Sequence, residues 1–185
     1  MELSSALRQV TMKRVARWIV ATLCVLSLRA PAQEEVRLSS PGGQCEFTFR
    51  MMQGVPQYAV SFKGRPLLEH SSLRLWFSDG GLFGNRLVMG TPAFEEVDTA
   101  YTLIVGKASR VPDRYREVRI PLEEGGGAHR QIIVVARAFD DGIAFRYDYP
   151  RQDGWLSYAL TEERSDFNIT GNPTLRTLFL RKHTT

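Results

Sequence analysis

The feature that most constrains the fold is a pair of apolar runs joined by a short polar break, in residues 131–150. The first run is rich in β-branched residues, and the second alternates apolar with polar side chains at period two, as β-strands do. Between them, Asp140-Asp141-Gly142 predicts a tight hairpin turn in which Gly142 takes a positive φ. An isolated hairpin is marginal in water, so other strands must cover its apolar face.

The rest of the chain supplies such strands as short alternating runs separated by Gly, Pro, Asn and Asp. No stretch has a convincing helical period, and residues 107–114 look irregular. We therefore predict an all-β protein, an antiparallel β-sandwich of two packed sheets. The predicted inward-facing sets are Cys45, Phe47, Phe49 and Met51; Tyr58, Val60 and Phe62; Leu73, Leu75 and Phe77; and Val118, Ile120 and Leu122.

Residues 1–32 have the pattern of a secretory signal peptide. Four basic residues precede an apolar run over residues 18–28, and Ala30-Pro31-Ala32 offers small residues where a signal peptidase cleaves. The run is shorter than the roughly 20 residues that a membrane-spanning helix needs, so a retained anchor is the weaker interpretation. We expect an exported protein, periplasmic or extracellular, with no membrane contact after cleavage.

Removing this segment changes the charge of the chain. The 185 residues carry a net charge of +4, but residues 1–32 hold five of the 24 Lys and Arg and one of the 20 Asp and Glu. The remainder has 19 of each and no net charge, which argues against a nucleic-acid partner. Only Cys45 remains outside the signal, so no internal disulfide is possible, and a small buried side chain in a strand is its expected role.

Several segments in order resemble the N-terminal domain of glycoside hydrolase family 97. They include FDDGIAFRYDYP at residues 139–150, LSSPGG at 38–43, PQYAVSFKGRPL at 56–67, SLRL at 72–75 and YRE at 115–117. The resemblance covers residues 36–172. It departs from the family at residues 101–106, where relatives carry a Trp-containing run, so contacts made there in relatives are not expected here.

The family comprises exported bacterial α-glucosidases and α-galactosidases. The resemblance implies a large β-sandwich of the galactose-mutarotase type, a supersandwich, packed against a catalytic (β/α)₈ barrel that is missing from these 185 residues. The catalytic carboxylates and most calcium-binding glutamates of relatives belong to that barrel. The resemblance therefore assigns no catalytic and no metal-binding residue to this chain, and calcium is implied only for the intact enzyme.

The family's N-terminal domain is also longer than this chain. We therefore expect a partial sandwich domain over residues 33–172. Residues 173–185 lack a clear strand alternation and are basic where the preceding segment is acidic. We predict that they form an atypical tail of a truncated or frame-shifted product.

Trp155 is the best candidate for a carbohydrate contact, because it lies beside a loop and a sugar ring stacks on indole as on apolar surface. A core or interface tryptophan is the commoner role. We interpret Asp140-Asp141 as turn residues, and Glu95-Glu96 and Glu162-Glu163 as solvated carboxylates. The three histidines have no metal-ligand spacing.

The sequence thus favours the N-terminal part of an exported α-glycosidase acting on α-glucosides or α-galactosides, non-catalytic alone. One alternative is a stand-alone carbohydrate-binding module. A third hypothesis is an exported β-sandwich that binds other proteins. Because a sandwich without its barrel exposes apolar surface or an open strand edge, we predict poor solubility or self-association.

Overall fold

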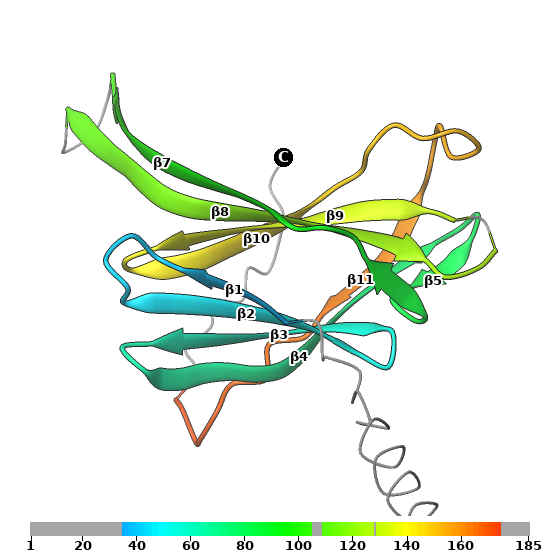
Figure 1. Ribbon diagram of the computed structural model, residues 1–185, viewed down its shortest axis with the longest axis horizontal. Helices are drawn as coiled ribbons and strands as arrows, with labels where there is room; N and C mark the ends of the chain where they lie inside the picture. Colours follow the sequence, from blue (N-terminus) through cyan, green and yellow to red (C-terminus); the bar gives the residue numbers. More distant parts are fainter. Residues whose placement is uncertain (1–34, 105–108, 128, 175–185) are drawn as a thin grey trace, which may run out of the picture. The chain divides into compact units, whose positions relative to one another are not determined.

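The computed structural model describes residues 35–104, 109–127 and 129–174. This part of the chain contains no helix. Its eleven strands form two antiparallel sheets that face each other (Figure 1). The predicted all-β antiparallel sandwich is therefore confirmed. The predicted signal peptide, residues 1–32, lies outside the described residues. Within the described ranges, no helix is long and apolar enough to cross a membrane.

The first sheet has six strands in the order β1-β2-β3-β4-β11, with β5 also paired to β4. It is built mostly from consecutive hairpins, so neighbours in sequence are neighbours in space. Its strands are β1 (Glu35–Ser39), β2 (Cys45–Met52), β3 (Val55–Phe62), β4 (Arg65–Phe77), β5 (Gly81–Phe83) and β11 (Leu160–Ser165).

The second sheet has five strands in the order β10-β9-β8-β6, with β7 also paired to β8. The predicted hairpin of residues 131–150 is present as β9 and β10, paired from Phe139↔Gly142 to Ile133↔Asp148. The strands are β6 (Leu87–Met89), β7 (Ala93–Thr102), β8 (Arg110–Glu124), β9 (Gln131–Phe139) and β10 (Gly142–Asp148).

The turn between β9 and β10 differs from the prediction in one respect. Gly142 does not have a positive φ; it already pairs with Phe139 as the first residue of β10. Asp140 and Asp141 alone form the loop, and the Asp140 carboxylate accepts a hydrogen bond of 2.6 Å from the Gly42 amide. Glycine supplies the positive φ in other hairpins, as at Gly54 and Gly64.

The core lies between the sheets and contains the predicted inward-facing residues except Phe62, which is only half-buried, with the Lys63 ammonium over its ring. Phe47, Phe49, Val118 and Ile120 are at most 1% exposed. Partly buried aromatic residues of β10 pack against this core at the open side of the sandwich. There Tyr147 Oη lies 2.8 Å from Ser165 Oγ, a contact that joins β10 of the second sheet to β11 of the first.

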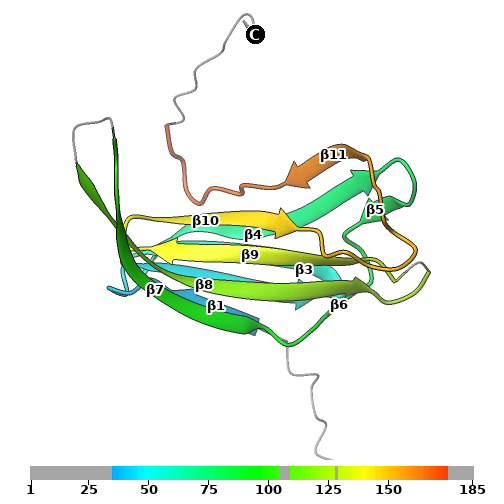
Figure 2. The ribbon, with the colours of Figure 1, turned by 90° about the horizontal axis from the view of Figure 1, so that it is seen from above.

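One prediction about β8 is wrong. Residues 110–114, expected to be irregular, are the start of β8 and pair with residues 98–102 of β7. β9 pairs with β8 only from Arg116 onward, so this part of the β7–β8 hairpin has two strands and no third neighbour. We call residues 97–104 and 110–115 the arm. Figures 1 and 2 show it curving away from the sandwich.

Candidate functional site

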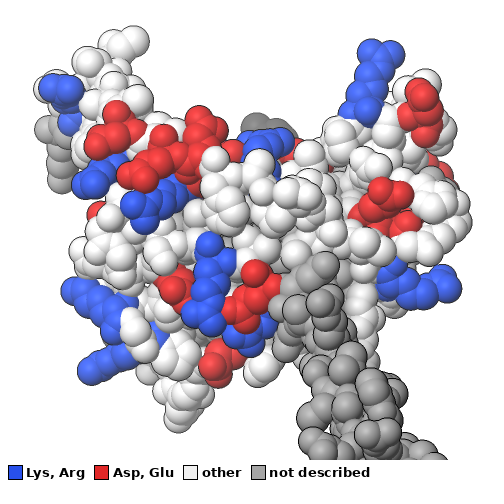
Figure 3. All heavy atoms as spheres, in the orientation of Figure 1, with Lys and Arg blue, Asp and Glu red and all other residues white. Residues whose placement is uncertain are grey.

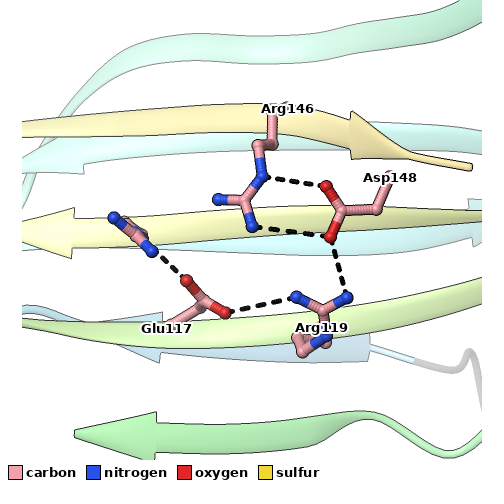
Figure 4. A network of polar contacts seen from close by, with 5 residues as sticks. Glu117, Arg119, Arg146 and Asp148 are labelled. Atoms are coloured by element: carbon pink, nitrogen blue, oxygen red, sulfur yellow. Dashed lines mark hydrogen bonds and ion pairs between the residues drawn. The ribbon is translucent and has the colours of Figure 1, made fainter. Parts of the chain in front are cut away.

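A network of ion pairs covers the outer face of the second sheet (Figure 4). Glu117 of β8 accepts a hydrogen bond of 2.7 Å from Arg137 Nε and lies 3.6 Å from Arg119 Nη1. Asp148 of β10 accepts a hydrogen bond of 2.8 Å from Arg119 and one of 2.9 Å from Arg146. We call these five residues the charge network. They alternate along their strands with core residues, which places them all on the face that points away from the core.

Strand register explains why these charges meet. Val135 of β9 lies opposite both Arg119 of β8 and Arg146 of β10, so the two guanidinium groups flank a small apolar side chain. Val135 is 1% exposed although it points away from the core, and the Glu117 side chain is 6% exposed. The network therefore shields part of its own sheet from water.

The electrostatics of the network favour its ionised form. Partial burial opposes ionisation of Asp148, but hydrogen bonds from Arg146 and Arg119 outweigh it and lower the pKa of the carboxyl. The hydrogen bond to Glu117 raises the pKa of Arg137, whose guanidinium also lies 4.3 Å from the centre of the Tyr115 ring. The hydrogen bonds of the network thus stabilise the charged forms of Asp148 and Arg137.

An open hollow of about 440 Å³ borders the network. Its lining includes the charged residues Arg119 and Asp148, the aromatic residues Tyr149 and Tyr158, and Ile133. The two tyrosine rings are stacked with their centres 4.5 Å apart. A surface that combines aromatic rings with paired polar groups suits contact with either a sugar or another protein.

Trp155, the predicted carbohydrate contact, lies near this hollow but does not line it. It is 9% exposed, and its ring packs edge-on against Phe77 at 5.0 Å and lies 5.1 Å from Tyr158. Of these rings, Tyr158 is the one exposed to solvent, at 44%. Trp155 is thus a member of an aromatic cluster at one end of the sandwich. Its role in binding carbohydrate stays a prediction.

Sequence reasoning missed the residue at the centre of that cluster, Arg130. Its guanidinium is 4% exposed and lies within 6 Å of the rings of Phe77, Phe83 and Trp155. Its Nη2 donates a hydrogen bond of 2.6 Å to the Glu124 carboxylate and one of 2.9 Å to the Gly80 carbonyl. An arginine that follows a glycine loop gives no sequence signal for burial, because the burying rings come from two segments distant from it, the β4–β5 hairpin and the loop that holds Trp155.

The acidic pairs considered from sequence are placed as expected. Asp140 lies in the β9–β10 turn, and its bonds to Ser40 and Gly42 lower the pKa of its carboxyl. Glu96 pairs with Arg116 at 2.9 Å and Glu162 pairs with Arg164 at 2.6 Å, and all four side chains are at least 39% exposed. None of them faces a second carboxylate across the hollow beside the charge network.

The acidic residues also bear on metal binding. In the described ranges, no three His, Cys, Asp or Glu side chains converge in a way that could hold a metal ion. Every carboxylate of the charge network is already matched by arginine. The described residues therefore do not fit a calcium site on their own, and calcium stays a prediction about an intact enzyme.

Comparison with known proteins decides the family. The model of the family described as "Glycosyl-hydrolase 97 N-terminal" matches residues 38–184, most of the chain. The chain belongs to glycoside hydrolase family 97. The match to this N-terminal domain includes residues 173–184, the segment predicted to be an atypical tail, of which residues 175–184 lie outside the described part of the chain.

Solved family 97 enzymes share the fold of this domain. A family 97 enzyme from Pseudoalteromonas sp. strain K8 in complex with panose superposes with a TM-score of 0.69 at 25% identity, as does its acarbose complex. A β-arabinopyranosidase superposes with a TM-score of 0.66 at 28% identity. The matches cover 73% and 72% of this chain but only 20% and 21% of those enzymes, so the family 97 domain here spans about a fifth of their length.

Proposed function

We propose that this chain is the N-terminal, non-catalytic part of an exported family 97 α-glycosidase that acts on α-glucosides or α-galactosides. Its role is to support the catalytic barrel and its carbohydrate-binding cleft, and calcium is bound by the intact enzyme. The observation that carries this proposal is the match to the family's N-terminal domain over residues 38–184.

The chemistry of the outer face supports a non-catalytic role. Glycoside hydrolysis needs two carboxylates about 5 to 9.5 Å apart on either side of one anomeric carbon. The hollow beside the charge network is lined by one carboxylate, Asp148, which two arginines already hold in its ionised form. A lone carboxylate with a lowered pKa is a poor general acid, and no second carboxylate lines this hollow to complete the pair.

The test is hydrolysis of aryl α-glucosides and α-galactosides by the purified chain, with an intact family 97 enzyme as the positive control. We expect no turnover above background for the chain. Turnover by the unmodified chain would contradict the proposed role. Loss of that turnover in Asp148→Asn would also contradict the assignment of the hollow as non-catalytic, whereas turnover retained in Asp148→Asn would come from other residues of this chain.

A stand-alone carbohydrate-binding module is the second candidate, favoured by the stacked Tyr149 and Tyr158 beside Arg119 and Asp148. Calorimetric titration with maltotriose and panose separates the two functions. Saturable binding that is weakened by Tyr158→Ala would favour the module, and absence of binding would favour the supporting domain.

A further inference from the structure

We propose that the outer face of the second sheet is the surface on which the rest of a family 97 enzyme docks. This inference rests on the proposed function, and it adds which surface of the domain makes the contact. The surface consists of the charge network, the arm on one side of it and the loop of residues 149–159 on the other. The arm and the loop rise on the same side of the second sheet in Figure 1, and the space-filling view shows a dip between them (Figure 3).

The arm carries four apolar residues on this face, two on each side of the polar pair Thr99 and Asp113. Strand alternation places Val97, Tyr101 and Val111 on the same side as Tyr115, which packs under Arg137 on the outer face. Tyr101 is 51% exposed, and Ile104 near the tip is fully exposed. A two-stranded ribbon is marginal in water when nothing packs on it. An exposed ribbon that carries such apolar residues is therefore expected to be stabilised by a partner.

The loop supplies exposed apolar side chains on the opposite side. Leu156 is the most exposed leucine of the described residues, at 73%, and Tyr158 lines the hollow beside Arg119 and Asp148. The arm and the loop thus give two groups of exposed apolar residues, with the charge network between them. Clusters of exposed apolar residues are more common on surfaces that bind another protein than on surfaces that stay in contact with water.

The charge network suits a surface that becomes covered. Burying an unpaired charge is costly, whereas an ion pair that is already hydrogen-bonded loses much less on desolvation. Glu117 and Asp148 are each bound by two arginines before any partner arrives. A partner can therefore cover this face without leaving an uncompensated carboxylate.

The shape and the family indicate the occupant. A second copy would meet this face with the same hollowed surface in a two-fold contact, and two hollows are not complementary. The chain matches about a fifth of the length of the solved family 97 enzymes, so most of such an enzyme lies outside the matched domain. We therefore assign the face to the catalytic part of a family 97 enzyme.

The test is assembly of the full 185-residue chain with the catalytic polypeptide of the Pseudoalteromonas enzyme, produced together and measured by size-exclusion chromatography and titration. We expect a one-to-one complex. Tyr101→Asp and Leu156→Asp should each weaken it at least tenfold. Leu67→Asp, which changes an exposed leucine of β4 in the first sheet, should have no effect. Circular dichroism of each variant verifies that the sandwich is retained.

Three results would overturn the proposal. The first is no complex with the unmodified chain, and the second is equal weakening by Leu67→Asp. The third is a discrete dimer of the chain alone that Tyr101→Asp dissociates, which would assign the face to a second copy. All three leave the non-catalytic role intact, because that role is tested by hydrolysis and not by assembly.

Discussion

Two Arg–carboxylate sites in this domain differ in how much water reaches them. Arg130 and Glu124 meet at one end of the sandwich inside a set of aromatic rings, with 4% and 15% of their side chains exposed. Arg146 and Asp148 meet on the outer face of the second sheet, where the arginine is about half exposed. Similar hydrogen bonds in different surroundings should therefore differ in what they contribute to stability.

The largest expected effect is at the enclosed site. Arg130→Met leaves Glu124 partly buried without its cation and removes the hydrogen bond to the Gly80 carbonyl. We expect a loss of about 3 kcal/mol in the free energy of unfolding, the lower end for breaking a buried ion pair. Urea unfolding followed by tryptophan fluorescence measures it, since Trp155 lies next to the guanidinium.

The matched control is Arg146→Met on the outer face, which removes an exposed pair and should cost less than about 1 kcal/mol. If the two substitutions destabilise the domain equally, burial does not distinguish the two sites and the comparison fails.

The sequence predicts the strands of this domain well but not its charged sites. Period-two alternation places Phe47, Phe49, Val118 and Ile120 in the core because each strand has one face toward the other sheet. The charge network depends on register between β8, β9 and β10, which alternation alone does not give. Arg130 is buried by rings that are far from it in sequence, so only the packed structure identifies it.

Two local misses have physical causes as well. Gly142 follows two aspartates, which is typical of a positive-φ turn, but Asp140 is held by the Gly42 amide from the other sheet. The β8 side of the arm was missed because Pro112 and the charged residues around it resemble a loop. Proline is tolerated there because that part of β8 has no third strand beside it.

Glu117 lies between the two extremes and should give an intermediate effect. Its side chain is 6% exposed, yet its partners Arg119 and Arg137 are more than a third exposed. Glu117→Gln keeps the shape and removes the charge, and we expect a loss of about 2 kcal/mol, within the range for a hydrogen bond to a charged group. Thermal unfolding measures the loss. A neutral result would mean that the two arginines find water or other acceptors without cost.

Asp148 should make the stability of the outer face depend on pH. Because the pKa of its carboxyl is lowered from 3.8 in the folded protein, its contribution is fully present above the unfolded value and is lost as the pH falls through the folded pKa. The difference in unfolding free energy between the unmodified chain and Asp148→Asn should therefore shrink as the pH falls from 7 to below 3. A difference that stays constant over this range would show that the arginines do not stabilise the ionised form.

The smallest expected effect is the response of the two sites to salt. Exposed charges are screened within about 3 Å at 1 M ionic strength, whereas solvent-excluded pairs are screened much less. Raising NaCl from 0.1 to 1 M should therefore remove most of the small cost of Arg146→Met and leave that of Arg130→Met nearly unchanged. Unfolding of both variants against the unmodified chain at each salt concentration measures this. Equal screening at both sites would mean that water reaches Arg130 as easily as Arg146, and the aromatic rings would then not explain its stability.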